Sequence, residues 1–221
     1  MEMERSFFAE LCAANAATHH ACLEHPVVVG IGHGELPESA FRSYIEQDFL
    51  FLRAYVRVLA RAVAASPTLD DATMLAELLH ATLTVEIEAL RALYASFDGD
   101  PGALDAGSMS ATTRAYTDHL LATSAEGSLP LILSSILPCQ WGYREIGHHL
   151  AARGLPADPR YAGWISEYTS DEYGALVDRI IARFDVLSCA ASSTERARCH
   201  DVFAVSSTYE RAFWAVEVSD G

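Results

Sequence analysis

The sequence predicts an all-α protein, a helical bundle folded as a single domain over residues 1–221. Apolar residues recur every three or four positions along almost the whole chain, which is the spacing of amphipathic helices. The only strand-like run is Val27-Val28-Val29, which is too short to indicate a sheet. The 221 residues are 51% hydrophobic, so the chain also has enough apolar material for a sizeable core.

Two apolar stripes predict the longest helices. The first begins after Leu36-Pro37-Glu38, a sequence typical of a helix start, and comprises Phe41, Tyr44, Ile45, Phe49 and Leu52. The second is a row of leucines in a helix expected from about Asp70 to Phe97. Further helices are expected over roughly 4–24, 110–125, 129–152, 158–187 and 194–216. Segments with turn residues at 30–34, 98–102 and 154–156 are expected to separate the helices, of which we predict about seven or eight.

The charge of the chain excludes several classes of function. The formal net charge is −15, the arginines are scattered, and the chain contains no lysine. A protein this acidic repels phosphates, so no nucleic-acid partner is expected. Without lysine, a Schiff base, a pyridoxal phosphate anchor and a P-loop lysine are impossible.

The N-terminal sequence and the cysteines favour a cytoplasmic location. Residues 1–5 lack the basic and apolar regions of a signal peptide. The longest charge-free run, Gly127 to Tyr143, contains two prolines and is too short to span a bilayer comfortably, so no membrane partner is expected. The chain has five cysteines and no C-x-x-C pair, which favours reduced thiols.

Four polar residues are predicted to lie on inward, apolar helix faces. Asp48 falls within the first stripe, Glu86 lies between leucines, Glu210 lies among aromatic residues, and Cys139 follows the spacing of Ile136 and Tyr143. An unpaired buried carboxylate costs several kcal/mol, so each acid needs a partner or a function. Together these residues predict an internal polar pocket that could hold a small molecule.

Cys139 directly follows Pro138, which we expect to kink its helix and turn the thiol towards a cavity. A cysteine nucleophile depends on thiolate, so a group that accepts the thiol proton is needed nearby. No histidine is obviously placed for this task. Glu210 or a tyrosine could accept the proton instead.

A second pattern favours a metal site. Glu77-x-x-His80 and Glu145-x-x-His148 are two E-x-x-H pairs on separate predicted helices. Di-iron helical bundles combine two such pairs with a glutamate from each of two other helices, and Glu86 and Glu210 could fill those positions. A di-iron oxidase that uses these two pairs is therefore an alternative function.

Motifs along almost the whole chain resemble the TenA family (thiaminase II) in its cysteine-containing branch. The opening motifs are His25-Pro26, Gly30-Ile31-Gly32-x-Gly34-x-Leu36-Pro37, Phe41-x-x-Tyr44 and Gln47-Asp48-x-x-x-Leu52. The cysteine motif is Leu137-Pro138-Cys139-x-Trp141-x-Tyr143-x-Glu145-x-Gly147. The closing motifs are Trp164-Ile165-x-x-Tyr168 and Phe203-x-x-Ser206-Ser207-x-Tyr209-Glu210-x-x-Phe213-Trp214.

The resemblance implies a haem-oxygenase-like fold, a homotetramer, and an activity that needs no metal or organic cofactor. The implied reaction is hydrolysis of a pyrimidine-CH2-N bond in thiamine salvage. Substrates of the family are thiamine and 4-amino-5-aminomethyl-2-methylpyrimidine, which give 4-amino-5-hydroxymethyl-2-methylpyrimidine. The resemblance does not rank these two small-molecule substrates. Within this fold, a haem-oxygenase-like di-iron oxidase and a non-catalytic member that binds a pyrimidine or acts as a regulator stay open as alternatives.

By position, the resemblance assigns Cys139 as the nucleophile and Glu210 as the proton-transfer carboxylate. Asp48 matches the acid that holds the aminopyrimidine. The tyrosines that line the pocket or form hydrogen bonds within it correspond to Tyr116, Tyr143 and Tyr168. Phe51 stands where the family often has tyrosine, so ring stacking is retained while a hydroxyl that could orient Glu210 or Cys139 is lost.

Overall fold

The computed structural model describes residues 6–215, and every regular element in that range is helical. The α-helices are α1 (Phe7–Ala14), α2 (Ala16–Leu23), α3 (Pro26–His33), α4 (Glu38–Ala64), α5 (Leu69–Ala81), α6 (Ile87–Ala95), α7 (Ala111–Ala125), α8 (Leu129–Ala151), α9 (Pro159–Tyr168), α10 (Asp171–Ala190) and α11 (Ser193–Phe213). A π-helical turn, η1 (Thr82–Glu86), joins α5 to α6, and a 3₁₀ segment, η2 (Pro101–Ala106), follows α6. The predicted all-α class is confirmed.

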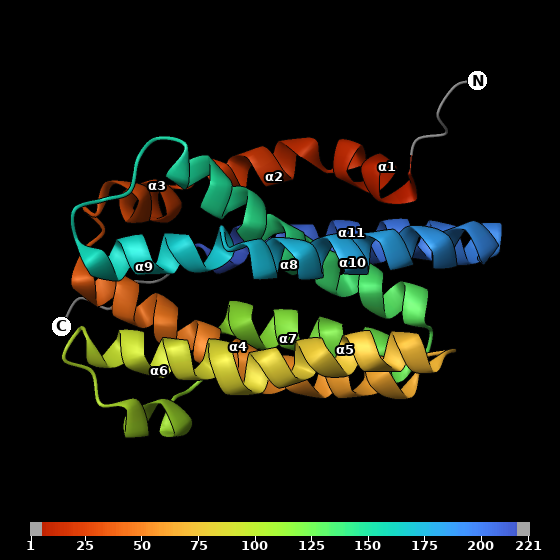
Figure 1. The fold of residues 1–221 in the computed structure, drawn as a ribbon, viewed down its shortest axis with the longest axis horizontal. Coiled ribbons are helices and arrows are strands. Elements are labelled where there is room, and N and C mark those ends of the chain that lie inside the picture. The colour runs from red at the N-terminus through yellow and green to blue at the C-terminus, as the bar shows by residue number, and fades with distance from the viewer. Residues whose placement is uncertain (1–5, 216–221) are drawn as a thin grey trace.

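The helices form a layered bundle around one apolar core. In Figure 1, α1, α2 and α3 lie along the top, α4, α5 and α6 lie along the bottom, and α8 to α11 lie between them. Helix α8 contacts α11, α10 and α9, while α4 contacts α5 and α7. The core is rich in aromatic rings, and its largest fully buried side chains include Trp214, Tyr44, Tyr55 and Tyr116.

Side chains that cap helix N-termini explain most of the helix starts. Such a side chain accepts a hydrogen bond from a backbone N–H that has no partner within the helix. Eight of the described α-helices begin in this way, after Ser6, His25, Thr68, Ser110, Ser128, Asp158, Ser170 and Ser192. The starts near 110, 129, 158 and 194 were predicted from the sequence, and the structure confirms them within a few residues.

Two predicted helices are each divided in the structure. The range 4–24 contains α1 and α2, separated at Asn15, whose side-chain amide donates to the Leu11 carbonyl (2.9 Å); residues 4 and 5 lie outside the described residues. The range 158–187 contains α9 and α10, because the Ser170 hydroxyl caps a new helix that has two acids in its first turn. The prediction of seven or eight helices is therefore too low. Residue 216, at the end of the last predicted helix, also lies outside the described residues.

The valine run and most of the glycine-rich segment after it form a helix, which corrects two expectations. Pro26 occupies the first turn of α3, His25 caps it, and Gly34 ends it with φ of +68°. Gly30 and Gly32 therefore lie inside α3 rather than in a loop between helices. A Cβ on Gly32 would lie 2.7 Å from Leu150 Cδ2, so glycine lets α3 pack closely against α8.

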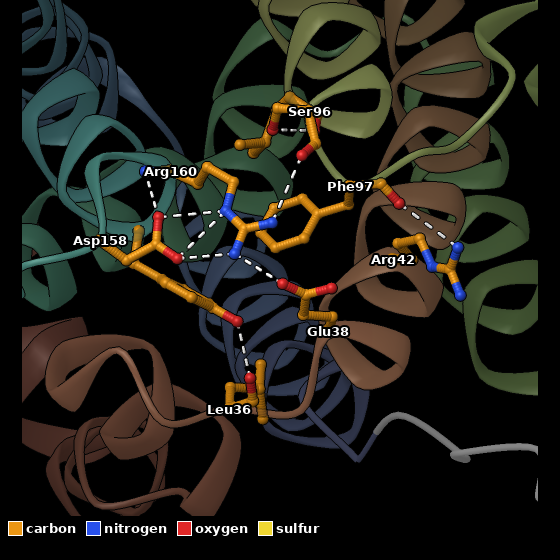
Figure 2. A network of polar contacts seen from close by, with 9 residues as sticks. Leu36, Glu38, Arg42, Ser96, Phe97, Asp158 and Arg160 are labelled. Atoms are coloured by element: carbon orange, nitrogen blue, oxygen red, sulfur yellow. Dashed lines mark hydrogen bonds and ion pairs between the residues drawn. The ribbon is translucent and has the colours of Figure 1, made fainter.

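A network around Arg160 fixes the N-terminal end of α9 (Figure 2). The guanidinium donates to Glu38 (2.6 Å), to both carboxylate oxygens of Asp158, and to the Ser96 carbonyl (3.3 Å). It also lies 4.0 Å from the centre of the Phe97 ring. These contacts join α9 to the start of α4 and the end of α6, and so position the residues that α9 contributes to the interior.

A buried ion pair joins α5 to α10. Asp71 is 4% exposed and contacts Arg183 at 2.5 Å and 2.8 Å, and the Thr68 hydroxyl donates to the same carboxylate at 2.7 Å. Burial tends to raise the pKa of Asp71, but the hydrogen bonds from Arg183 and Thr68 outweigh it, and the pKa is lowered.

Among residues 6–215, no helix is both long enough and apolar enough to cross a bilayer.

We predict that Arg183→Met lowers the free energy of unfolding by about 2–3 kcal/mol, because it leaves the Asp71 carboxylate buried without its cation. Arg179→Met is the matched control on the same helix, since Arg179 pairs with Glu77 in solvent, with both side chains more than half exposed. The control variant is expected to change stability by less than about 0.5 kcal/mol. Urea denaturation of both variants measures the difference, and equal effects would contradict the assignment.

Candidate active site

The structure brings all seven predicted site residues to one region of the interior. They come from five helices: Asp48 and Phe51 from α4, Tyr116 from α7, Cys139 and Tyr143 from α8, Tyr168 from α9 and Glu210 from α11. Asp48 is 4% exposed, Glu210 is 7% exposed, and Cys139 is partly buried. Helix α8 continues through Pro138, and the kink expected there stays a prediction.

Glu210 is held by a tyrosine hydroxyl from another helix. Tyr116 Oη donates a hydrogen bond to Glu210 Oε1 at 2.5 Å, a short distance typical of a hydroxyl that donates to a carboxylate. Burial raises the pKa of Glu210 to about 7, although the hydrogen bond from Tyr116 acts in the opposite direction. Glu210 can therefore both give and accept a proton near neutral pH.

Asp48 lies at the end of a chain of tyrosine hydroxyls. Tyr44 Oη donates to Asp48 Oδ2 at 3.2 Å and lies 3.2 Å from the Tyr143 hydroxyl. Burial raises the pKa of Asp48 to about 7; the hydrogen bond from Tyr44 counteracts this effect and the charge of Glu210 adds to it. The two acids are thus close enough to influence each other's ionisation.

Cys139 lies within electrostatic reach of three carboxylates. Burial raises its pKa well above the usual range for cysteine, and the charges of Glu210, Glu86 and Asp48 raise it further. The side chain is therefore a thiol at rest, and a thiolate forms only if a neighbour takes the proton as the sulfur reacts. Carboxylates with pKa values near 7 are suitable acceptors.

Aromatic rings enclose this group of acids and the thiol. Phe51 lies 5.0 Å from Tyr116 and Tyr143 lies 4.9 Å from Tyr168, measured between ring centres. Rings at such distances provide flat apolar surfaces against which a heterocycle can stack. The arrangement suits a small, planar, nitrogen-containing ligand with several hydrogen-bonding atoms.

Sequence reasoning missed three residues of the same region. Tyr44 holds Asp48, and the buried Tyr55 hydroxyl lies beside the side chain of Gln140, whose Oε1 atom is buried with no partner. A signal for the tyrosines was present, because positions 44, 48, 51 and 55 follow a 4-3-4 spacing and share one face of α4. No comparable signal indicates Gln140.

The structure does not support the di-iron alternative. Glu77 faces solvent and pairs with Arg179, while Glu145 pairs with Arg144 on its own helix. Within residues 6–215, no group of three or more His, Cys, Asp and Glu side chains is arranged to hold a metal ion. The two E-x-x-H pairs therefore lie at the surface and do not come together as ligands of one metal site.

The fold and the site define a class, that of helical-bundle proteins with a haem-oxygenase-like fold and a polar site enclosed by the helices. A domain of unknown function with a heme oxygenase-like fold from Shewanella denitrificans superimposes with a TM-score of 0.71, covering 94% of this chain and 90% of that one, at 12% identity. The chain belongs to the TENA/THI-4/PQQC family, which it matches over residues 13–220. The family resemblance seen in the sequence is thus confirmed.

Two relatives show how closely the chain follows this family. An aminopyrimidine aminohydrolase of Halalkalibacterium halodurans is 36% identical over 212 residues, which cover 95% of this chain and 94% of that protein. A TenA homologue from P. horikoshii superimposes with a TM-score of 0.87 at 29% identity, covering 95% of this chain and 97% of that one. The similarity therefore extends over the whole bundle rather than a local motif.

We predict that the stability of the protein falls as the pH rises from about 4.5 to 7, because the folded state holds Glu210 and Asp48 protonated where the unfolded chain has lost those protons. Glu210→Gln removes one of the two groups, so the decline should become shallower. Melting temperatures recorded between pH 4.5 and 8 measure this slope. Glu172→Gln, an exposed change on α10, is the control, and identical slopes in all three proteins would contradict the proposed burial of Glu210.

Proposed function

We propose that this protein is an aminopyrimidine hydrolase of the thiaminase II type. It cleaves the pyrimidine-CH2-N bond of 4-amino-5-aminomethyl-2-methylpyrimidine, thiamine, or both, and yields 4-amino-5-hydroxymethyl-2-methylpyrimidine for thiamine salvage. The observation that carries the proposal is the grouping of Cys139 with Asp48 and Glu210, two buried acids whose pKa values are raised to about 7. The name of the relative that is 36% identical supports hydrolysis of this substrate class.

Cys139 is the nucleophile in this proposal, and Glu210 moves its proton. The sulfur adds to the electron-poor pyrimidine ring, which breaks the aromaticity of the ring. Glu210 accepts the thiol proton and passes a proton to the nitrogen on the methylene, so the nitrogen leaves as ammonia. With thiamine, the nitrogen already carries a positive charge and leaves as the neutral thiazole without a proton.

Asp48 compensates the charge that appears on the ring. It gives a proton to a ring nitrogen as the sulfur adds, and takes it back as the C–N bond breaks. Water then adds to the exposed methylene carbon, with its hydroxide on carbon and its proton passed through the acids to the ring. Loss of the sulfur, which regains its proton, restores the aromatic ring and releases the alcohol.

The aromatic rings hold the flat substrate and keep bulk water away from the thiol. Stacking on Phe51 and Tyr116 contributes about 0.5–1.5 kcal/mol for each ring pair beyond the burial of apolar surface. Tyr143 and Tyr168, whose ring centres lie 4.9 Å apart, add further aromatic surface. No metal or organic cofactor takes part in these steps.

The assembly and location of the protein are part of the proposal. We infer from the family resemblance that the chain, as one domain, assembles into a homotetramer. The five free cysteines support a cytoplasmic location, where thiols stay reduced.

We predict that Cys139→Ser lowers the rate of hydrolysis at least about 1,000-fold while pyrimidine binding persists, because the variant lacks the nucleophile and keeps the walls of the site. Cys189→Ser is the matched control, since Cys189 is exposed and distant in sequence from the site. Product analysis after incubating each pure protein with both substrates measures the effect. Unchanged hydrolysis together with stoichiometric iron would instead select the di-iron oxidase, and pyrimidine binding without turnover by the native chain would select a binding protein.

We also predict that Glu210→Gln lowers kcat by about 100- to 10,000-fold for the aminomethyl substrate, because glutamine cannot transfer the thiol proton to the leaving nitrogen. The loss should be smaller for thiamine, whose leaving group needs no proton. The two kcat ratios, measured under the same conditions, test this difference. Equal losses on both substrates would assign Glu210 to thiol activation alone.

A further inference from the structure

Glu86 is an acid of the interior to which the reaction above gives no task. It ends the π-helical turn η1, which changes the register between α5 and α6. A π-turn inside a longer helix is rare because it interrupts the regular hydrogen-bond pattern, and it frequently occurs at a functional site. Here it directs the partly buried Glu86 side chain towards α8 and α9, where it lines a hollow with Gln140, Glu167 and Tyr168.

A side chain that lines the hollow carries a polar atom without a partner. Gln140 is 3% exposed, its Oε1 atom accepts no hydrogen bond, and the side chain lines the same hollow as Glu86. A buried acceptor without a donor costs free energy, so its presence points to a ligand that brings one. An N–H donor that also carries a positive charge would satisfy both Gln140 and the carboxylate of Glu86.

Glu86 is electrostatically connected to the reacting sulfur. Its charge raises the pKa of Cys139 and the pKa values of Tyr55 and Tyr168. The pKa of Glu86 itself is raised to about 8, by burial first and by the charges of Asp48 and Glu167, while Thr82 lowers it. A cation beside Glu86 would favour its ionised form and relieve the repulsion among these acids.

A second hollow reaches the site at Glu210, but it is less suited to a cation. Its walls include Cys22, His19 and Trp141, and Glu210 is the only acid among them. The hollow at Glu86 instead has two acids, and it adjoins a groove that shares Glu86, Glu167 and Tyr168 and adds Trp164 and Leu93. Aromatic walls with two carboxylates attract a positively charged nitrogen group.

The one cation of that groove is already neutralised. Arg160 also lines it, but its guanidinium is bound to Asp158 at 2.7 Å and to Glu38 at 2.6 Å. The remaining acids around the opening are Glu86 and Glu167, and Glu86, whose pKa is raised to about 8, gains its charge when a cation binds beside it. A negative opening concentrates cations and disfavours anions.

We propose that Glu86 binds the positively charged leaving group of the substrate, and that the hollow lined by Glu86 and Gln140 receives this group. The inference rests on the hydrolysis proposed above, because both candidate substrates carry a cation at the bond that breaks: a thiazolium ring, or the aminomethyl group once Glu210 has protonated it. Glu86 is thus a specificity residue for cationic pyrimidines. The alcohol product is neutral, so Glu86 holds it less tightly and product release is favoured.

The test compares ligands that differ in this charge. In a Cys139→Ser background, which prevents turnover, calorimetry measures the binding of 4-amino-5-aminomethyl-2-methylpyrimidine and of the neutral 4-amino-5-hydroxymethyl-2-methylpyrimidine. Glu86→Gln keeps the shape of the side chain and removes its charge. We expect it to raise the Kd of the amine at least about tenfold and to leave the Kd of the alcohol within about twofold. Glu88→Gln is the matched control two residues further along, where the carboxylate faces solvent, and should change neither value.

Steady-state kinetics in the Cys139-containing enzyme give a second measurement. Glu86→Gln should raise KM for the amine and for thiamine while kcat changes less than about threefold, because the charge acts on binding before the C–N bond breaks. Equal weakening of amine and alcohol, or no weakening of either, would overturn the role of Glu86 and leave hydrolysis intact. If the native chain binds the amine but releases no ammonia, hydrolysis fails and the ratio of the two Kd values still decides the role of Glu86. Binding of neither pyrimidine would overturn both proposals.

Discussion

The constraint on which the site depends is the placement of two buried carboxylates, a partly buried third and a partly buried thiol inside an apolar bundle. In such surroundings the charged form of an acid is disfavoured, and each charge also disfavours its neighbours. The pKa values of Asp48 and Glu210 therefore rise to about 7, that of Glu86 rises to about 8, and Cys139 remains a thiol. Acids that share protons near neutral pH are what a reaction with several proton transfers requires.

The aromatic side chains offset part of the free-energy cost of burying these acids. Hydroxyls of Tyr116 and Tyr44 donate to the carboxylates of Glu210 and Asp48, so two of the acids keep a hydrogen-bond partner without water. The same rings form the walls that would hold a heterocycle. At the periphery, the Arg160 network fixes α9 against α4 and α6, which holds Tyr168 and Trp164 in place (Figure 2).

The arrangement of the acids separates the tasks of the proposed reaction. In the proposed reaction, Asp48 holds the ring, Glu210 moves the proton of Cys139, and Glu86 binds the cationic nitrogen group before it is displaced. Each acid comes from a different segment, α4, α11 and the η1 turn, so each is oriented independently of the others. The absence of lysine from the chain means that no ammonium side chain competes with a cationic substrate for these carboxylates.

The sequence by itself determined the helical class, the faces that are buried and the polar residues on those faces, because a polar residue within an apolar stripe is visible in local periodicity. Asp48, Glu86, Cys139 and Glu210 were all identified in this way. Only the tertiary structure decided their partners: Tyr116 meets Glu210 across 94 residues of chain, and Gln140 joins Glu86 from another helix. Periodicity reports that a face is buried and not what covers it. Likewise, the valine run is helical in the structure because α3 has a proline in its first turn and packs against α8. Such tertiary contacts outweigh the modest strand preference of valine.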